Sequence, residues 1–369
     1  MNASDSHQHV LDLTPDRLAE LLTSSGEKPF RARQVLEWVY QHGAVSFDEM
    51  TNLSKPLREM LKQRLVVYAS EIIRRSVSSD GTVKLLLKWP DGATSECVLI
   101  PEEPRRTACI SSQVGCPVGC RFCASGMNGL QRNLTAGQIV EQVLRVGAEA
   151  AADGGRLSNV VFMGLGEPLA NYDAVMSAVR TINASWGPNI GARKITISTV
   201  GLPKQIRRLA DEGLQLNLAL SLHAPTDELR EQLIPWARKI SIADIIEACR
   251  YYFEKTGREI TLEYILLHEV NDRRTHAQQL ARFAKQLRCN INLIRYNVVE
   301  GLPFARPSGE EAHVFQRELR EHGVNAHIRT SRGLDIEAAC GQLRRREMLE
   351  AQAGEGRQPP VRIGIERRE

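Results

Sequence analysis

The sequence has no long apolar run: nowhere do its 369 residues approach the roughly 18 consecutive apolar residues of a membrane-spanning helix. Its first residues, MNASDSHQHVLDL, lack the basic and then apolar segments of a secretory signal. Cysteine is sparse, with eight residues in a long chain, which argues against the disulfide framework of small secreted domains. We therefore expect a cytoplasmic protein with reduced thiols and no membrane partner.

A strong excess of charge of one sign is also missing. The net charge is +4, which is compatible with a nucleic-acid partner but does not require one. Hydrophobic residues make up 42% of the chain and charged residues 25%, as in ordinary globular proteins. The length allows one large enzyme domain and a smaller one.

Three of the eight cysteines lie close together in VGCPVGCRFCASG: Cys116, Cys120 and Cys123. No histidine lies near them and no second C-x-x-C occurs in the chain, so the four ligands of a structural zinc site are not evident. Zinc and unreactive thiols remain the alternatives. Closely spaced thiolates are typical ligands of iron–sulfur clusters, and three of them leave one iron of a four-iron cluster open. The spacing resembles the cluster loop of the radical S-adenosylmethionine enzymes.

The pattern of apolar residues divides the chain into four regions. We predict an N-terminal helical region, a small β extension, a core of β/α units and a disordered polar tail, at residues 1–65, 66–101, 102–348 and 349–369. The β extension is marked by two Asp-Gly turn signals, at residues 80–81 and 91–92. The segment PEEPRR that follows it reads as a linker.

Six apolar strand patterns, each followed by a helical pattern, make up the core region. The expected strands are ACISSQ, NVVFMG, KITIST, LNLALSLH, ITLEYILL and INLIRYN. Repeated β/α units imply a parallel sheet. We therefore predict an α/β fold, preceded by the helical and β accessory region. The resemblance of the cysteine loop to the radical S-adenosylmethionine enzymes implies that the core is their partial (β/α)6 barrel, which is TIM-like.

Glycine and polar residues follow the predicted strands, at the edge where parallel β/α folds form their sites. In MGLGEP, Gly166 lets the backbone approach a ligand closely and Glu167 offers a carboxylate to an ammonium group. After the cysteine loop, this segment resembles the one that holds the amino group of S-adenosylmethionine in radical enzymes. Other strand ends add Ser198, Ser221, Leu222, His223 and Asn297. Each alone is an ordinary strand-end residue, but together they are expected to bind the cofactor's ribose and carboxylate.

The chain as a whole resembles the bacterial dual-specificity RNA adenine carbon-2 methyltransferases, from about Pro29 to Leu343. The segments that carry the resemblance are FRARQVLEWVY, FDEMTNLSKPLR, SECVLIP, SSQVGCPVGCRFCASG, NLTAGQIVEQV, MGLGEPLANY, ISTVGL, LALSLHAP, INLIRYN and RGLDIEAACGQL. There are small departures: Ser125 stands where the family often has threonine, and NVVEGLPFARPS is one of several variants of its loop. Neither touches a proposed ligand or nucleophile.

The resemblance implies that the three loop cysteines bind a [4Fe-4S] cluster and that two molecules of S-adenosylmethionine are used per turnover. The first would methylate Cys340, and the second would yield a radical that removes a hydrogen atom from that methyl group. The carbon radical would then add to carbon 2 of adenine as a protein–RNA thioether. Glu96 would accept the proton from carbon 2. Cys109 would attack the sulfur of Cys340, forming a transient disulfide and releasing the methylated base.

The implied substrates are 23S rRNA at the peptidyl transferase centre and tRNA just 3′ of the anticodon. The same family resemblance implies that the N-terminal helical region binds RNA. An electron donor and a disulfide reductant, such as flavodoxin and thioredoxin systems, are implied as well, and we expect a monomer. Two alternatives stay open: the sister methyltransferase of carbon 8 of the same rRNA adenosine, and a non-catalytic iron–sulfur or zinc protein that binds RNA. A radical enzyme acting on protein glycine would leave the segment around Cys340 without a role.

Overall fold

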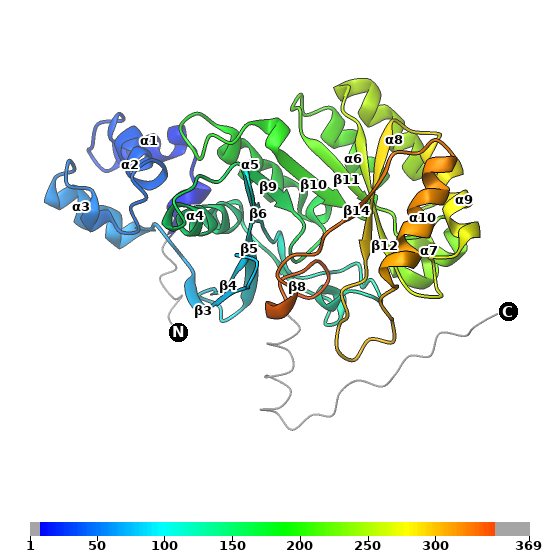
Figure 1. Cartoon of the computed structure of the whole chain (residues 1–369). Coiled ribbons are helices and arrows are strands. Elements are labelled where there is room, and N and C mark those ends of the chain that lie inside the picture. The colour runs from blue at the N-terminus through cyan, green and yellow to red at the C-terminus, as the bar shows by residue number, and fades with distance from the viewer. Residues whose placement is uncertain (1–7, 344–369) are drawn as a thin grey trace.

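A single ten-stranded sheet runs through the molecule in the computed structural model, which describes residues 8–343 (Figure 1). The predicted disordered tail, 349–369, lies outside these residues. From one edge to the other, the strands are β14 (Ala326–Arg329), β13 (Cys289–Arg295), β12 (Ile260–Leu266), β11 (Asn217–Ser221), β10 (Ile195–Thr199), β9 (Asn159–Phe162), β6 (Arg105–Cys109), β5 (Thr94–Glu102), β4 (Val83–Lys88) and β3 (Glu71–Val77).

The strands from β6 to β14 are parallel, and helices connect them. All six predicted core strands are present, which confirms the α/β prediction. The helices that follow them are α4 (Ala136–Ala152), α5 (Tyr172–Asn183), α6 (Pro203–Ala210), α7 (Asp227–Leu233), α8 (Ile242–Thr256), α9 (Arg274–Ala284) and α10 (Gly309–Glu321). Local sequence sets their starts: in α4, Thr135 accepts from the Gln138 N–H (3.2 Å) and Gln138 accepts from the Thr135 N–H (3.1 Å), a capping box.

The seventh parallel strand, β14, was not among the predicted strands. It has only four residues, AHIR, and only Ala326 is buried. Such a short segment with two charged or polar side chains carries no apolar run by which a strand could be recognised. It pairs with β13 through Ile291–Ala326 to Ile294–Arg329, so its end reaches the same edge of the sheet as the other strand ends.

The predicted β extension forms β3 to β5, an antiparallel meander that continues the same sheet. Both Asp-Gly turns lie where the sequence predicts them, and Gly81 adopts a positive φ of 82°. The PEEPRR segment is not a linker between separate bodies. It is the turn between β5 and β6, which pair directly along their length.

Three helices form the N-terminal region, as predicted: α1 (Pro15–Ser24), α2 (Arg31–Tyr40) and α3 (Lys55–Arg64). They lie at one end of the molecule beside α4 (Figure 1). Partly buried hydrogen bonds connect this region to α4: Asp12 accepts from the Gly137 N–H at 2.5 Å, and Glu141 of α4 accepts from the Ala69 N–H at 2.8 Å. Short elements complete the fold: β1 (Gln8–His9), β2 (Leu65–Val66), η1 (Val10–Asp12), η2 (Phe47–Glu49), η3 (Ala124–Gly126), η4 (Pro168–Asn171), η5 (Ala192–Lys194), η6 (Pro235–Lys239) and η7 (Leu334–Ile336).

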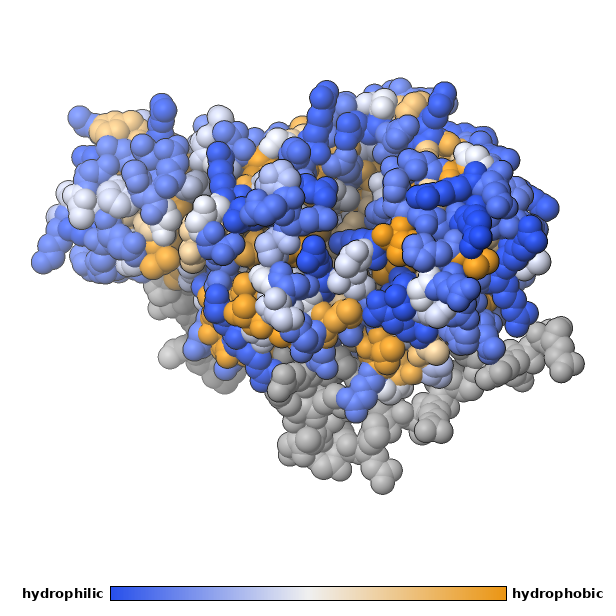
Figure 2. Space-filling view, viewed as in Figure 1, coloured by the Kyte–Doolittle hydropathy of each residue, from blue (hydrophilic) through white to orange (hydrophobic). Residues whose placement is uncertain are grey.

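The largest apolar core joins these N-terminal helices to the sheet and its covering helices. The surface is mainly polar, with apolar patches over the antiparallel meander and beside it (Figure 2). Exposed apolar residues there include Ile72, Ile73 and Val77 of β3. In the part of the chain from residue 8 to residue 343, no helix is long and apolar enough to cross a membrane.

Candidate active site

The three-cysteine loop lies between two short paired strands, β7 (Gln113–Gly115) and β8 (Leu130–Asn133). Cys116, Cys120 and Cys123 are half-buried and none of them forms a disulfide. They pack against an apolar cluster that includes Val118 and Phe122. Burial raises the pKa of Cys116 to about 12. Because burial disfavours free thiolates, three thiols placed together suit a soft metal group that stabilises their deprotonated form.

Glycine makes the loop compact enough to wrap a ligand. A Cβ at Gly126 would lie 2.9 Å from Cα of Gly119 and 3.2 Å from N of Cys120. Any larger residue would therefore push the turn away from the cysteines. The loop thus fits an iron–sulfur cluster in donor chemistry and in the close approach of its backbone.

Glu167 lies in the turn after β9, directly before η4, and is almost completely buried. Its carboxylate accepts from the Val200 N–H (2.7 Å) and the Leu169 N–H (3.0 Å), and burial raises its pKa to about 7. Gly166 has a φ of 102°, and a Cβ there would lie 2.6 Å from Cβ of Gln113. The turn therefore requires glycine, and it presents a buried carboxyl group that a cation would stabilise.

The ends of β10 and β11 bring Ser198 and Ser221 together, with their hydroxyls 3.2 Å apart. His223 follows β11 with a positive φ of 59°, and its Nδ1 accepts from the Ile265 N–H at 3.1 Å. Burial lowers the pKa of His223 to about 3, so the ring is neutral and carries its proton on Nε2. These three side chains line the same cavity as Glu167 and the loop cysteines.

Two predicted cofactor residues are placed differently. The Leu222 side chain is buried in the main core, and its N–H donates to the Glu263 carbonyl at 3.1 Å. Asn297 is buried, donates to the carbonyl of Cys340 (3.1 Å) and accepts from the Ser331 hydroxyl (2.7 Å). Neither side chain lines the cavity, so Asn297 holds the Cys340 segment in this structure.

Cys340 itself lines the cavity, beside the cluster loop. The neighbouring Gly341 carbonyl accepts from the Ala124 N–H at 2.8 Å, which fastens the Cys340 segment directly to the loop. Two chain segments that are more than two hundred residues apart therefore meet at one cavity. This contact could not be read from the spacing of either motif.

Cys109, at the end of β6, lies just behind the cavity wall in a small apolar cluster with Ala338 and Leu343, which flank Cys340. Burial raises the pKa of Cys109 to about 12, and the nearby Cys340 adds to the rise. Glu96 of β5 is fully buried and pairs with Lys84 at 3.0 Å. Lys84 also donates to the Glu337 carbonyl at 3.2 Å, so this ion pair is connected to the Cys340 segment.

Two charged cavity residues were missed by the sequence analysis. Glu263 of β12 is 4% exposed; one oxygen accepts from Asn292 (3.1 Å) and the other has no hydrogen-bond partner. Arg329 is the last residue of β14. Its pKa is raised, first by Cys340 and also by Glu263, although burial alone would lower it. The carboxylate in the apolar segment LEYILL was a usable signal for Glu263. Arg329 had none, because its strand was not recognised.

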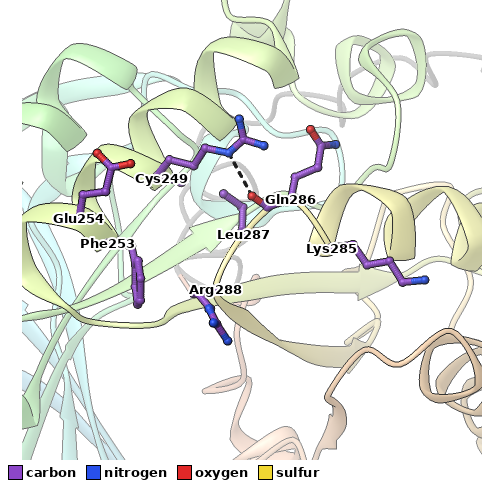
Figure 3. Close-up of a pocket in the computed structure, with 8 residues that line it drawn as sticks. Cys249, Phe253, Glu254, Lys285, Gln286, Leu287 and Arg288 are labelled. Carbon is purple, nitrogen blue, oxygen red and sulfur yellow. Dashed lines mark hydrogen bonds between the residues drawn. The ribbon is translucent and has the colours of Figure 1, made fainter.

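The cavity that collects these groups has a volume of about 160 Å³. A second hollow, of about 210 Å³, lies between α8 and the turn before β13 (Figure 3). Its lining includes Arg250, Lys285 and Arg288, and Arg250 donates to the Gln286 carbonyl at 3.1 Å. It contains none of the predicted site residues, so the smaller cavity is the candidate active site.

Comparison with known proteins gives matches along almost the whole chain. Residues 8–67 match the ribosomal RNA large subunit methyltransferase N-terminal domain, and residues 110–284 match the radical SAM superfamily. A probable dual-specificity RNA methyltransferase RlmN of Geobacillus kaustophilus is 46% identical over 341 residues, covering 92% of this chain and 93% of that protein. One from Thermotoga neapolitana is 48% identical over 339 residues, covering 91% and 97%. The crystal structure of a radical SAM methyltransferase from Sphaerobacter thermophilus superposes with a TM-score of 0.90 and 47% identity, covering 91% of this chain and 99% of that one.

Proposed function

Since the chain belongs to the RlmN family of radical S-adenosylmethionine RNA methyltransferases, we propose that it methylates carbon 2 of adenine in 23S rRNA and in tRNA. The family implies a [4Fe-4S] cluster and S-adenosylmethionine as cofactors. The proposal assigns the cluster to Cys116, Cys120 and Cys123. It assigns the cofactor to the pocket formed by Glu167, Ser198, Ser221 and His223.

One observation carries the proposal: Cys340 and the three loop cysteines line one cavity. A thiol that only packs the core would not need to face a cluster site. A methyl carrier must do so, because it has to meet both the methyl donor and the radical that activates it. The Gly341–Ala124 hydrogen bond keeps the Cys340 segment close to the cluster loop.

When bound, the cluster and S-adenosylmethionine supply the one-electron chemistry that carbon 2 of adenine requires, since this electron-poor carbon does not attack a methyl sulfonium. The chain's own groups hold and release the substrate. Cys340 carries the methyl group and forms the thioether to the base. Glu96 accepts the proton of carbon 2, and the Cys109 sulfur attacks the Cys340 sulfur, so that an S–S bond forms as the C–S bond to the product breaks.

The buried state of Cys109 supports its place as the last nucleophile. A thiol with a pKa of about 12 is almost entirely protonated at neutral pH, so it does not compete with Cys340 for the methyl donor. An electron donor and a disulfide reductant, of the flavodoxin and thioredoxin types, complete the cycle. The N-terminal helices, joined to α4, would contact RNA through its shape and phosphates.

The test is nucleoside mass spectrometry of rRNA and tRNA from cells that lack this enzyme family, with and without this gene. We expect 2-methyladenosine in both RNAs, dependent on Cys340. Methylation of carbon 8 alone would contradict the proposed position and favour the sister activity. Unchanged RNA methylation by Cys340→Ala would contradict the proposed carrier.

A further inference from the structure

A fully buried arginine lies behind the cluster loop. Arg230 of α7 is 0% exposed, although a guanidinium is among the groups most costly to bury without a partner. Its α7 neighbour Leu233 accepts from the Arg121 N–H at 2.9 Å, and Arg121 directly follows Cys120. Helix α7 is therefore hydrogen-bonded to the loop between the second and third cysteines.

The hydrogen bonds of Arg230 use only two of the five N–H groups of its guanidinium. One terminal nitrogen donates to the Val200 carbonyl and the other, at 3.4 Å, to the Ile240 carbonyl. Its Nε is buried and has no partner. Val200 in turn donates its N–H to the Glu167 carboxylate at 2.7 Å. The backbone of Val200 therefore connects the guanidinium to the carboxylate that is proposed to bind the cofactor.

Arg230 also lacks a paired carboxylate. Within residues 8–343, no Asp or Glu forms an ion pair with it, and Asp227 on the same helix accepts from the Ile242 N–H (2.8 Å) instead. Burial lowers the pKa of Arg230 to about 10, which still leaves it charged at neutral pH. The charge of Cys120 is the largest influence that opposes this fall. Asp227 also opposes the fall, but more weakly than Cys120. A buried positive charge, ion-paired with no carboxylate of residues 8–343, thus lies near Cys120 of the proposed cluster site.

We propose that Arg230 is the counter-ion of the iron–sulfur cluster, donating its free Nε–H to the sulfur of Cys120, a proposed cluster ligand, and raising the cluster's reduction potential. The inference depends on the proposed cluster site. A cubane held by three thiolates carries a net negative charge, and one-electron reduction adds another. A fixed cation in a poorly polarisable interior therefore stabilises the reduced form more than the oxidised form. Hydrogen bonds to cluster sulfur act in the same direction.

A purely structural role makes a different prediction. If Arg230 only ties α7 to β10 through Val200, its replacement changes stability but leaves the potential of a fully loaded cluster unchanged. Arg258 offers a matched control, since its guanidinium donates to an uncharged acceptor, the Asn217 side chain, and it too has a buried, unpartnered Nε. It precedes β12, at the end of the strands away from the cavity.

The experiment is an EPR-monitored redox titration of the full chain, reconstituted anaerobically as wild type, Arg230→Gln, Arg230→Lys and Arg258→Gln. At equal iron and sulfide content, we expect Arg230→Gln to weaken one-electron reduction at least tenfold, a shift of about 59 mV to more negative potential. Arg230→Lys keeps the charge and should shift less, and Arg258→Gln should not shift. A wild-type midpoint in loaded Arg230→Gln overturns the inference, and failure of the wild type to bind a cluster overturns the proposed function instead.

A measurement on the unaltered chain covers the case in which Arg230→Gln does not fold. With 15N in the arginine guanidinium groups, pulsed EPR of the reduced cluster should detect a coupled 15N nucleus. No 15N coupling would mean that no guanidinium donates to the cluster, and the proposal would be wrong.

Discussion

Glu167 is a buried carboxyl group whose hydrogen bonds come from the uncharged Val200 and Leu169 amides. Its pKa of about 7 in the folded chain lies above the usual value of 4.5, so between these pH values the folded state binds a proton that the unfolded state has released. This contribution to stability is therefore present at low pH and is lost as the pH rises through 7. Its size is roughly 3 kcal/mol.

Glu167→Gln should remove this pH dependence. We compare the free energies of unfolding of the two proteins in urea, without S-adenosylmethionine. The value for the variant minus that for the wild type should rise by roughly 3 kcal/mol from pH 4.5 to pH 8. The variant should also bind S-adenosylmethionine more weakly, because the cofactor's ammonium group loses its partner. A constant difference between the two proteins across this pH range would show that Glu167 is not perturbed.

Replacement of Cys340 and replacement of Cys109 should block RNA methylation at different steps. Cys340→Ala removes the methyl carrier, so RNA methylation should fall below detection. Cys109→Ala should leave the thioether unresolved and accumulate a covalent protein–RNA adduct, visible as a ribonuclease-sensitive band on a denaturing gel. Cys289→Ala, at the far end of β13, is the control and should methylate normally. An active Cys109→Ala enzyme without an adduct would remove Cys109 from the mechanism.

At the scale of elements, the cluster loop depends on the close contact at Gly126. Its missing Cβ leaves only 2.9 Å to Cα of Gly119, and backbone cannot move aside as a flexible side chain can. Gly126→Ala should therefore distort the loop and lose most of the bound iron after reconstitution, measured as iron per chain. Gly147→Ala in α4 meets nothing within 4 Å and should keep its iron. Equal iron in both variants would show that the loop tolerates a Cβ.

Elements defined by local sequence were predictable, and those defined by pairing were not. Short continuous segments contain the loop cysteines, the glycines and the strand-end serines. Their positions directly after predicted strands place them at the carboxyl edge of the sheet. The cavity charges depend on register: Glu263 lies beside Asn292 of β13, and Arg329 beside Ile294. Such neighbours follow from the alignment of three strands. The same limit applies to Asn297, whose partner Cys340 lies in a segment with no regular pattern.

At the scale of the whole molecule, the Cys340 segment is held by parts of the chain far from it in sequence. Asp80, in the first turn of the meander, accepts from the Gly333 N–H at 3.0 Å, and Asp335 accepts from the Ser78 hydroxyl at 2.5 Å. Lys84 reaches Glu337 from the next strand. The meander therefore braces the segment from one side, and Asn297 and the cluster loop brace it from the other.

This bracing predicts that a residue outside the cavity controls methyl transfer. Burial alone would raise the pKa of Asp80, but hydrogen bonds from Thr82, Gly333 and Ser78 lower it to about 2, so it is an anion throughout the working range of pH. Asp80→Ala should loosen residues 333–343, speed their amide hydrogen exchange and lower the rate of methylation several-fold at unchanged iron content.

Glu102→Ala, at the exposed end of β5 in the same meander, is the matched control and should change neither property. If Asp80→Ala keeps both the exchange of residues 333–343 and the methylation rate of the wild type, the cluster loop and Asn297 suffice to place Cys340. The meander would then contribute to the sheet but not to the positioning of the methyl carrier. Faster amide hydrogen exchange of residues 333–343 together with a normal methylation rate would mean that the segment reaches its working position without the hydrogen bonds of Asp80.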